Sequence, residues 1–224
     1  MLPEIPKKLC RIDDSTRAQH FFLDEADRCF YIWEYAARKG YSFSPSNQLI
    51  SNLKIEPSQI AKSPGRNRYK QQAISHSAAA LRKLIGRATA EGPSTFIPVP
   101  GSKALDDADY DDRLIRVLQL TFENWNVDFR SLLKVTASTE ADHKSAARLS
   151  FDELRALTRL KTATRTPLKP RVIVVDDVLN SGKHFKVAQS VITESFPDAD
   201  VRGLFLARCV RNNVADEFDA IDDV

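Results

Sequence analysis

The segment at residues 171–175 constrains the fold more than any other part of this 224-residue chain. It reads Arg-Val-Ile-Val-Val and is followed by two aspartates, a turn of small residues and a helix-like stretch. A continuous run of β-branched residues is typical of a strand buried on both faces, as parallel strands are. Similar apolar runs occur at 95–100 and 203–207. Strands that alternate with helices predict an α/β fold with a mostly parallel sheet and helices on both faces.

The connecting segments carry helix and turn signals that fit this arrangement. Residues 113–122 predict a helix capped by Asp111 or Asp112, and residues 127–135 contain a second short strand. Residues 136–150 are polar and predict a loop. A helix over 150–160 begins with Ser150 and Glu153, which have capping-box spacing, and another helix is expected over 183–196.

Residues 1–90 predict a small helical domain that precedes an α/β domain at 91–224. Breaker residues at 90–94 separate the two. Apolar side chains spaced by three and four predict a helix over 24–39; they are Leu23, Ala26, Phe30, Trp33 and Ala37. A second helix is expected to start at Ser44-Pro45, and a third covers 66–87.

The charge of the chain is unevenly divided. Residues 1–90 contain 15 Lys and Arg against 8 Asp and Glu, whereas residues 91–224 contain 18 against 22. A basic cluster of this kind can track a phosphate backbone; its members are Lys62, Arg66, Arg68, Lys70, Arg82, Lys83 and Arg87. The aromatic residues here have helical spacing, which favours a core over base stacking. We therefore expect an interface with a second copy or a protein partner, and nucleic-acid binding is not favoured.

Several classes of protein are excluded by composition. No apolar run approaches the ~20 residues of a membrane span, and the N-terminus lacks the layout of a signal peptide. The three cysteines cannot all pair, and none lies in a CxxC motif, which argues against a disulfide framework or a zinc finger. A cytoplasmic location is expected.

Residues 172–184 carry the clearest chemistry of the chain. Asp176 and Asp177 follow the buried strand, at the edge where parallel sheets bind ligands. Residues 180–184 then lead into a helix N-terminus, whose N–H groups favour a phosphate. Two carboxylates can hold a sugar diol and support Mg²⁺. The combination predicts a ribose 5-phosphate site; the alternative is a turn in which Asp176 caps the helix and Asp177 is solvated.

This segment, VIVVDDVLNSGKH, resembles the PRPP-binding motif of type I phosphoribosyltransferases. Three further segments are similar to the ComF-like branch of that family: Phe-Ile-Pro-Val-Pro at 96–100, Leu-Leu-Lys at 132–134 before a basic loop at 136–149, and the strand at 203–208. The resemblance covers about residues 94–209 of the sequence. It departs from the family pattern at Asn180, at His184 and at 110–113, where Tyr-Asp-Asp-Arg replaces Arg-Gly-Phe-Asn.

The resemblance implies a role for each matching segment. Asp176 and Asp177 would bind the ribose hydroxyls and Mg²⁺. The 5′-phosphate would be held by Val178, Leu179, Asn180, Ser181, Gly182, Lys183 and His184. The pyrophosphate loop would consist of Pro100, Gly101, Ser102 and Lys103. Residues 136–149 would form a lid, in which Lys144 or Arg148 neutralises the departing pyrophosphate.

The expected activity is Mg²⁺-dependent transfer of a phosphoribosyl group, or the reverse cleavage of an N-glycosidic bond, in nucleotide metabolism. The alternative is a non-catalytic module that senses PRPP or a nucleotide and acts with nucleic acid or a protein partner, for example in bacterial defence. In the family that the sequence resembles, a hood region selects the acceptor, and residues 1–90 or a partner would supply it. Three features argue against ordinary base transfer, one of them the absence of the Arg-Gly-Phe-Asn signature at 110–113. Asn180 stands where hypoxanthine-type members have a catalytic Asp, and five aspartates crowd residues 106–112.

Overall fold

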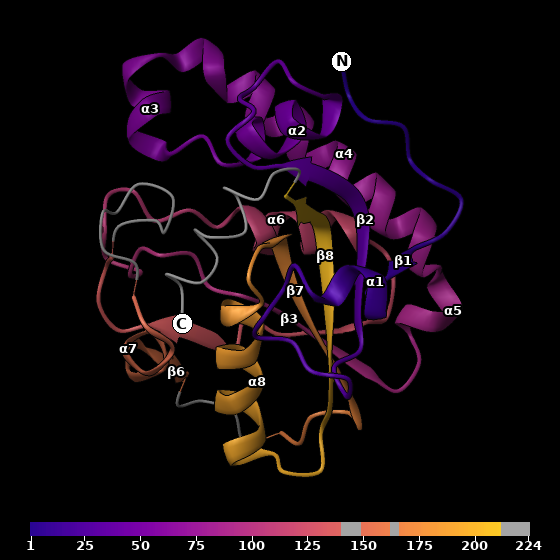
Figure 1. Cartoon of the computed structure of the whole chain (residues 1–224). Helices are drawn as coiled ribbons and strands as arrows, with labels where there is room; N and C mark the ends of the chain where they lie inside the picture. The colour runs from indigo at the N-terminus through magenta and orange to yellow at the C-terminus, as the bar shows by residue number, and fades with distance from the viewer. Residues whose placement is uncertain (140–148, 162–165, 212–224) are drawn as a thin grey trace.

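The computed structural model describes residues 1–139, 149–161 and 166–211. Within these residues, a six-stranded sheet has the order β1-β2-β8-β7-β3-β4 (Figure 1). The strands are β1 (Cys10–Arg11), β2 (Cys29–Ala36), β3 (Ser94–Pro98), β4 (Asp128–Phe129), β7 (Arg171–Leu179) and β8 (Asp200–Val210). Strand β1 is antiparallel to β2, and the other neighbours are parallel. A separate antiparallel pair consists of β5 (Leu133–Val135) and β6 (Thr158–Leu160).

Helices cover both faces of the six-stranded sheet. One face packs against α2 (Pro45–Leu53), α4 (Asn67–Ile85) and α6 (Arg113–Thr121) through a buried cluster that includes Leu49, Leu81 and Leu118. The other face packs against α7 (Phe151–Leu157) and α8 (Lys183–Ser195) through a cluster that includes Leu154 and Ile192. The short helices are α1 (Asp14–Arg17), α3 (Pro57–Lys62), η1 (Pro64–Arg66) and α5 (Arg87–Ala90). The prediction of an α/β fold with a mostly parallel sheet is confirmed.

The pleat of β7 sends neighbouring side chains to opposite faces of the sheet. Val172 and Val174 lie in the cluster beneath α7 and α8, whereas Val175 lies in the cluster beneath α4 and α6. Side chains alternate along a strand with a period of two. This alternation does not continue to the end of the strand, because Val178 packs on the cluster beneath α4 and α6 and Leu179 lies in the cluster beneath α7 and α8.

Capping residues and apolar spacing in the sequence predict the positions of most helices correctly. Helix α2 begins after Ser44, whose Oγ accepts a hydrogen bond from the backbone N–H of Asn47 at 3.1 Å, and Pro45 occupies its first position. Helix α7 begins with the capping box of Ser150 and Glu153. Helices α4, α6 and α8 also lie where the sequence predicts them. These starts are confirmed because caps act within one turn of the chain.

The predicted helix over residues 24–39 is wrong. Residues Cys29–Ala36 form β2, which pairs in parallel with β8. Tyr31 contributes to one buried cluster and Ile32 to the other, so this strand is apolar on both faces. A strand buried on both faces contains a near-continuous apolar run, which also satisfies helical spacing. The pairing of residues 29–36 with β8, which is distant in the sequence, decides that they form a strand and not a helix.

The sheet is continuous across residue 90, where the sequence predicts a division into two domains. Strand β2 belongs to the same sheet as β3, β7 and β8. One buried cluster combines Leu49 and Leu81 with Val117 and Leu204. Residues 1–90 are therefore not helical throughout, and their helices cover the face of a sheet that later strands complete (Figure 1).

Two predicted boundaries shift in the structure. The strand predicted over 171–175 extends to Leu179, so the aspartate pair lies within β7. The helix predicted over 150–160 ends at Leu157, and Thr158–Leu160 form β6. In the described part of the chain, no helix combines the length and the apolar character needed to cross a membrane.

Candidate functional site

A cleft of about 780 Å³ opens at the carboxyl ends of the parallel strands. Its lining comes from the ends of β2, β7 and β8, the loop after β3, and helices α2 and α8. Parallel strands bring their carboxyl ends to one edge of the sheet, which explains why segments far apart in the sequence meet here. Asp176, Asp177 and His184 lie on this lining together with Gly101 and Lys54.

Asp177 is held in a buried ion network on the α6 face. Its Oδ2 accepts hydrogen bonds from Nε and Nη2 of Arg113 at 2.9 and 2.6 Å, and its Oδ1 lies 3.0 Å from Nζ of Lys54. The side chain is buried. Burial alone would raise the pKa of Asp177, but Lys54 and Arg113 hold it well below the usual value. The alternative of a solvated Asp177 is therefore wrong, because the side chain is buried and both of its oxygens have cationic partners. Asp177 still lines the cleft, and its binding of a ligand stays a prediction.

The network continues from Arg113 into the helical face. Nη1 of Arg113 donates to Oδ2 of Asp111 at 2.9 Å, and Nζ of Lys70 lies 2.7 Å from the same oxygen. Nζ of Lys70 also donates to the carbonyl oxygens of Leu53 and Ile55. Asp111, which the sequence suggested would crowd a pyrophosphate site, lines the cleft and also links α4 to the start of α6. Removing one partner from such a network leaves an unpaired buried charge.

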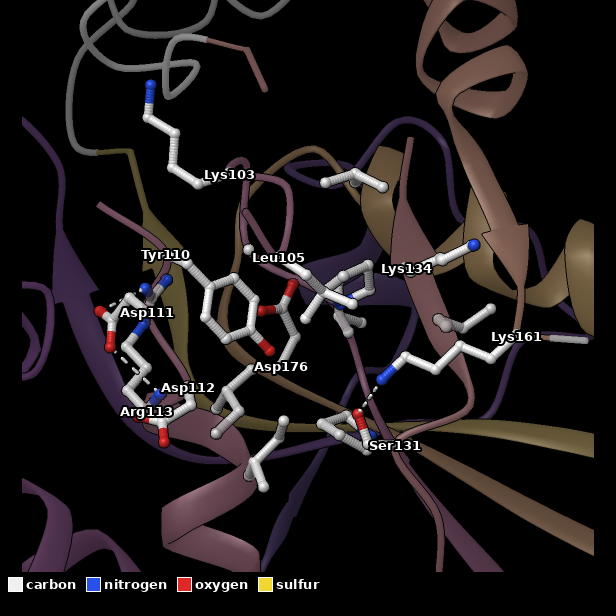
Figure 2. Close-up of a pocket in the computed structure, with 18 residues that line it drawn as sticks. Lys103, Leu105, Tyr110, Asp111, Asp112, Arg113, Ser131, Lys134, Lys161 and Asp176 are labelled. Carbon is white, nitrogen blue, oxygen red and sulfur yellow. Dashed lines mark hydrogen bonds and ion pairs between the residues drawn. The ribbon is translucent and has the colours of Figure 1, made fainter. Parts of the chain in front are cut away.

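Asp176 lines a hollow that lies between the start of α6, the loop after β3 and strand β5. In Figure 2 it lies at the centre of this hollow, with Tyr110 on one side and Lys134 and Lys161 on the other. Nζ of Lys161 donates to Oγ of Ser131 at 2.9 Å. Burial, followed by the charge of Asp177, raises the pKa of Asp176 to about 6. Asp176 is thus the member of the pair whose carboxylate faces the space where a ligand would lie.

The turn between β7 and α8 is covered by an N-terminal segment that sequence reasoning missed. The backbone N–H of Phe22 donates to the carbonyl oxygen of Ser181 at 3.0 Å, and Nδ1 of His20 contacts the carbonyl oxygen of Asn180. Gly182 has a φ of 92°, and a Cβ there would lie 2.9 Å from Cδ2 of Leu23. Glycine is therefore required at this turn both by conformation and by close packing.

The covering segment divides the predicted phosphate-binding residues into two groups. Val178, Asn180 and His184 line the cleft. Leu179, Ser181, Gly182 and Lys183 are buried, and Nζ of Lys183 donates to the carbonyl oxygen of Leu149 at 2.5 Å. The N-terminus of α8 still borders the cleft through His184, Val187 and Ala188. An anion at this end would meet the positive pole of a 13-residue helix.

Asn180 is engaged in the cleft by an arginine. Nη2 of Arg211 donates to Oδ1 of Asn180 at 2.9 Å, and Nη1 of Arg211 contacts the carbonyl oxygen of Gln19. The side-chain amide of Asn180 is neutral, and it does not take up a proton at neutral pH. Arg211 also lines the cleft, so it adds positive charge beside the turn. No local pattern in the sequence indicated Arg211, Lys54 or His20, because their partners are distant in the chain.

The predicted pyrophosphate loop lies on the β3 side of the cleft. Pro100, Gly101, Ser102 and Lys103 all line it. The carbonyl oxygen of Ser102 accepts a hydrogen bond from the backbone N–H of Thr139 at 2.9 Å, and the N–H of Ala104 donates to Oγ of Ser138. In Figure 2 the side chain of Lys103 extends away from Asp176. Lys144 and Arg148, the predicted lid cations, lie outside the described residues.

The donor set suits a magnesium ion only in part. Among the described residues, no group of three or more His, Cys, Asp or Glu side chains is arranged to hold a metal. Both oxygens of Asp177 have cationic partners, so the predicted pair reduces to Asp176. Mg²⁺ commonly uses one or two carboxylates together with phosphate oxygens and water. Asp176 could supply the protein oxygen of such a site, with a bound ligand supplying others.

No protein-family model matches the chain, and no curated protein matches it.

Proposed function

We propose that the protein binds PRPP or another ligand with a ribose 5-phosphate unit in this cleft, and that it transfers or cleaves the phosphoribosyl group. The observation that carries the proposal is the meeting of three segments at one edge of the sheet. Asp176 of β7, the N-terminus of α8 and the loop at 100–103 come from separate stretches of sequence, yet all line the same cleft. A sugar phosphate needs these three features side by side: an acceptor for hydroxyl groups and two regions that favour anions.

Each segment has a distinct role in the proposal. The carboxylate of Asp176 accepts hydrogen bonds from the ribose hydroxyls and, as an anion, stabilises positive charge that develops on the ring in an oxocarbenium-like transition state. The 5′-phosphate lies at the N-terminus of α8, near His184 and Arg211. The loop at 100–103 faces the pyrophosphate. When bound, Mg²⁺ would neutralise pyrophosphate oxygens beside Asp176.

Asp177 has a positioning role in this proposal. Its ion pairs with Lys54 and Arg113 fix the end of β7 against α2 and α6. Those pairs also cancel one of two adjacent negative charges. Asp176 can therefore remain ionised near neutral pH, because a second unpaired carboxylate beside it would raise its pKa further.

A non-catalytic binding module is the second candidate, and one observation favours it. Oδ1 of Asn180 accepts a hydrogen bond from Arg211, and the amide cannot act as a general base. A module of this kind would bind the ribose phosphate and would not turn it over. The two candidates are distinguished by the rate at which the wild type hydrolyses or exchanges PRPP. A rate above that of the Asp176→Asn variant indicates the enzyme, and an equal rate indicates the binding module.

Isothermal titration of the full chain with PRPP and with ribose 5-phosphate, each with and without Mg²⁺, tests the proposal. We expect both to bind, PRPP more tightly with Mg²⁺. Asp176→Asn should weaken binding by at least about tenfold, the loss expected when a charged acceptor is removed. The matched control is Asp200→Asn, at the start of β8 and the opposite edge of the sheet. Equal affinity of the wild type and the Asp176 variant would contradict the proposal.

A further inference from the structure

Two exposed segments adjoin the end of α2. Residues 39–43, Lys-Gly-Tyr-Ser-Phe, follow β2, and residues 61–69, Ala-Lys-Ser-Pro-Gly-Arg-Asn-Arg-Tyr, run from the end of α3 through η1 into α4. Every residue of both segments is exposed. We call the two segments together the α2–α4 surface. In Figure 1, α2 lies beyond the arrowhead of β2 and α3 extends further in the same direction.

Side-chain contacts join both segments to the last turn of α2. Nδ2 of Asn52 donates to the hydroxyl of Tyr41 at 3.5 Å. Nζ of Lys70, the residue directly after the second segment, donates to the carbonyl oxygen of Leu53 at 3.1 Å. Asn52 and Leu53 are neighbours at the end of α2, so the two segments meet there although they are distant in the sequence. Arg66 also lines the cleft, so the α2–α4 surface borders the cleft mouth.

The α2–α4 surface is cationic and contains no Asp or Glu. Residues 57–90, which include its second segment, contain seven Lys and Arg and no acidic residue. Lys70 is buried against Asp111 and does not add to the exposed charge. The last carboxylate before this stretch, Glu56, belongs to the capping box of α3. Exposed cations of this kind attract a phosphate backbone; on the surface they are Lys39, Lys62, Arg66 and Arg68.

In the described part of the chain, every exposed aromatic side chain lies on the α2–α4 surface. Tyr41, Phe43 and Tyr69 are 49, 53 and 38% exposed. The guanidinium of Arg68 lies 4.6 Å from the ring centroid of Tyr69. Unpaired bases stack on aromatic rings and on guanidinium planes. The expectation against nucleic-acid binding depended on aromatic residues that lie in a core, and these three lie outside it.

The composition of the surface favours nucleic acid over a protein partner. Neither segment contains Val, Leu, Ile or Met, whereas the core of a protein interface is apolar and contains few lysines. Cations lie close to aromatic rings along both segments, Lys39 near Tyr41 and Arg68 beside Tyr69. A phosphate and the base next to it can therefore be bound by neighbouring side chains. Because a duplex hides the faces of its bases, exposed rings favour a single strand.

We infer that the α2–α4 surface binds single-stranded nucleic acid without sequence preference. Its four cations contact phosphates, and bases stack on Tyr41, Phe43 and Tyr69. The inference does not depend on the proposed function, since none of these aromatic residues lines the cleft. The bound strand passes the cleft mouth, because Arg66 belongs to both.

Fluorescence anisotropy of the full chain with a labelled oligothymidylate of about 15 nucleotides tests the inference. Each phosphate contact on a single strand contributes about −0.7 to the slope of log K against log salt, so four contacts predict a slope of about −3. Affinity should therefore fall about fiftyfold between about 50 and about 200 mM salt. The single strand should bind at least about fivefold more tightly than a duplex of the same length, since one stacked base provides that much.

Two sets of variants separate phosphate contacts from base contacts. The triple variant Lys62→Ala, Arg66→Ala, Arg68→Ala should reduce the slope from about −3 to about −1. The double variant Tyr41→Ala, Phe43→Ala should weaken binding at least about tenfold at every salt concentration and leave the slope unchanged. The exchange variant Tyr41→Phe, Phe43→Tyr keeps both rings and should bind like the wild type.

The matched control is the triple variant Lys7→Ala, Lys8→Ala, Arg11→Ala. It also removes three exposed cations, and Arg11 lies in β1 at the edge of the sheet. This control should keep both the affinity and the slope, and circular dichroism checks that every variant is folded. An equal loss of affinity in the two triple variants would overturn the inference, because net charge alone would then explain binding.

Three other results would also overturn the inference. One is the absence of oligothymidylate binding at about 50 mM salt, where phosphate contacts are strongest. Another is equal affinity for the duplex and the single strand, which would remove the role of the exposed rings. The third is binding of polyglutamate as tight as that of oligothymidylate, which would assign the α2–α4 surface to an acidic protein partner.

Discussion

Nζ of Lys54 lies 3.0 Å from Oδ1 of Asp177, so the residue that follows α2 is joined directly to β7. Arg113, at the start of α6, binds the other oxygen of the same carboxylate. Asp176, one residue earlier, lines the hollow that also contains Tyr110, Lys134 and Lys161. Two adjacent aspartates of one motif therefore have different tasks: Asp177 joins the strand to the helices, and Asp176 faces the ligand space.

Asp177→Asn should destabilise the protein strongly. The substitution leaves Arg113 and Lys54 without their shared carboxylate in a buried setting, which costs about 3–5 kcal/mol in comparable networks. Urea unfolding at pH 7, followed by circular dichroism, measures the change in the free energy of unfolding. A loss below about 1 kcal/mol would show that the network does not hold α2 and α6 to β7.

Asp176→Asn should have the opposite effect on stability. The pKa of Asp176 is raised to about 6 in the fold, against 3.8 for the free group, so the folded state binds more protons between these values. Its ionisation therefore costs stability as the pH rises from about 4 to 6, and the cost is fully present at pH 7. We expect the variant to gain about 1–3 kcal/mol at pH 7 and to match the wild type near pH 4. A variant less stable than the wild type at pH 7 would contradict this assignment.

His20 should make the fold sensitive to mild acid. Burial, reinforced by the charges of Arg208 and Arg211, lowers the pKa of His20 to about 4, whereas the free group titrates near 6.5. The unfolded chain therefore takes up this proton first, and stability is lost as the pH falls from about 6.5 to 4. The loss from this group is up to about 3 kcal/mol. Urea unfolding of the wild type and His20→Gln across this pH range measures it, and equal pH slopes in the two proteins would contradict the prediction.

Gly182→Ala should be costly, and Gly65→Ala should not. Alanine at position 182 would have to adopt a φ of 92° and place its Cβ 2.9 Å from Cδ2 of Leu23. Strain of this kind costs about 1–3 kcal/mol. A Cβ added at Gly65 would meet no atom within 4 Å, so this position provides the control. Thermal unfolding measures both, and a similar melting temperature for the two variants would show that residues 20–23 do not constrain the turn.

Local sequence signals were sufficient for much of the fold. The capping residues Ser44 and Ser150 marked the starts of α2 and α7, because a cap binds N–H groups within its own first turn. The β-branched run of β7 identified a strand buried on both faces. The turn that follows it, with Gly182 at its centre, indicated the start of α8. Each of these signals depends only on residues near one another in the chain.

The sequence by itself also indicated which segment would carry the candidate site, because the aspartate pair follows a β-branched run whose burial is evident from its composition. Tertiary structure alone decided that residues 29–36 form β2, since their apolar pattern fits a helix as well as a strand until β8 pairs with them. It also decided that Asp177 pairs with Lys54 and Arg113 while Asp176 faces the cleft. The periodicity of a sequence specifies the faces of a single element, but the partner of a charged side chain depends on which elements the sheet order brings together.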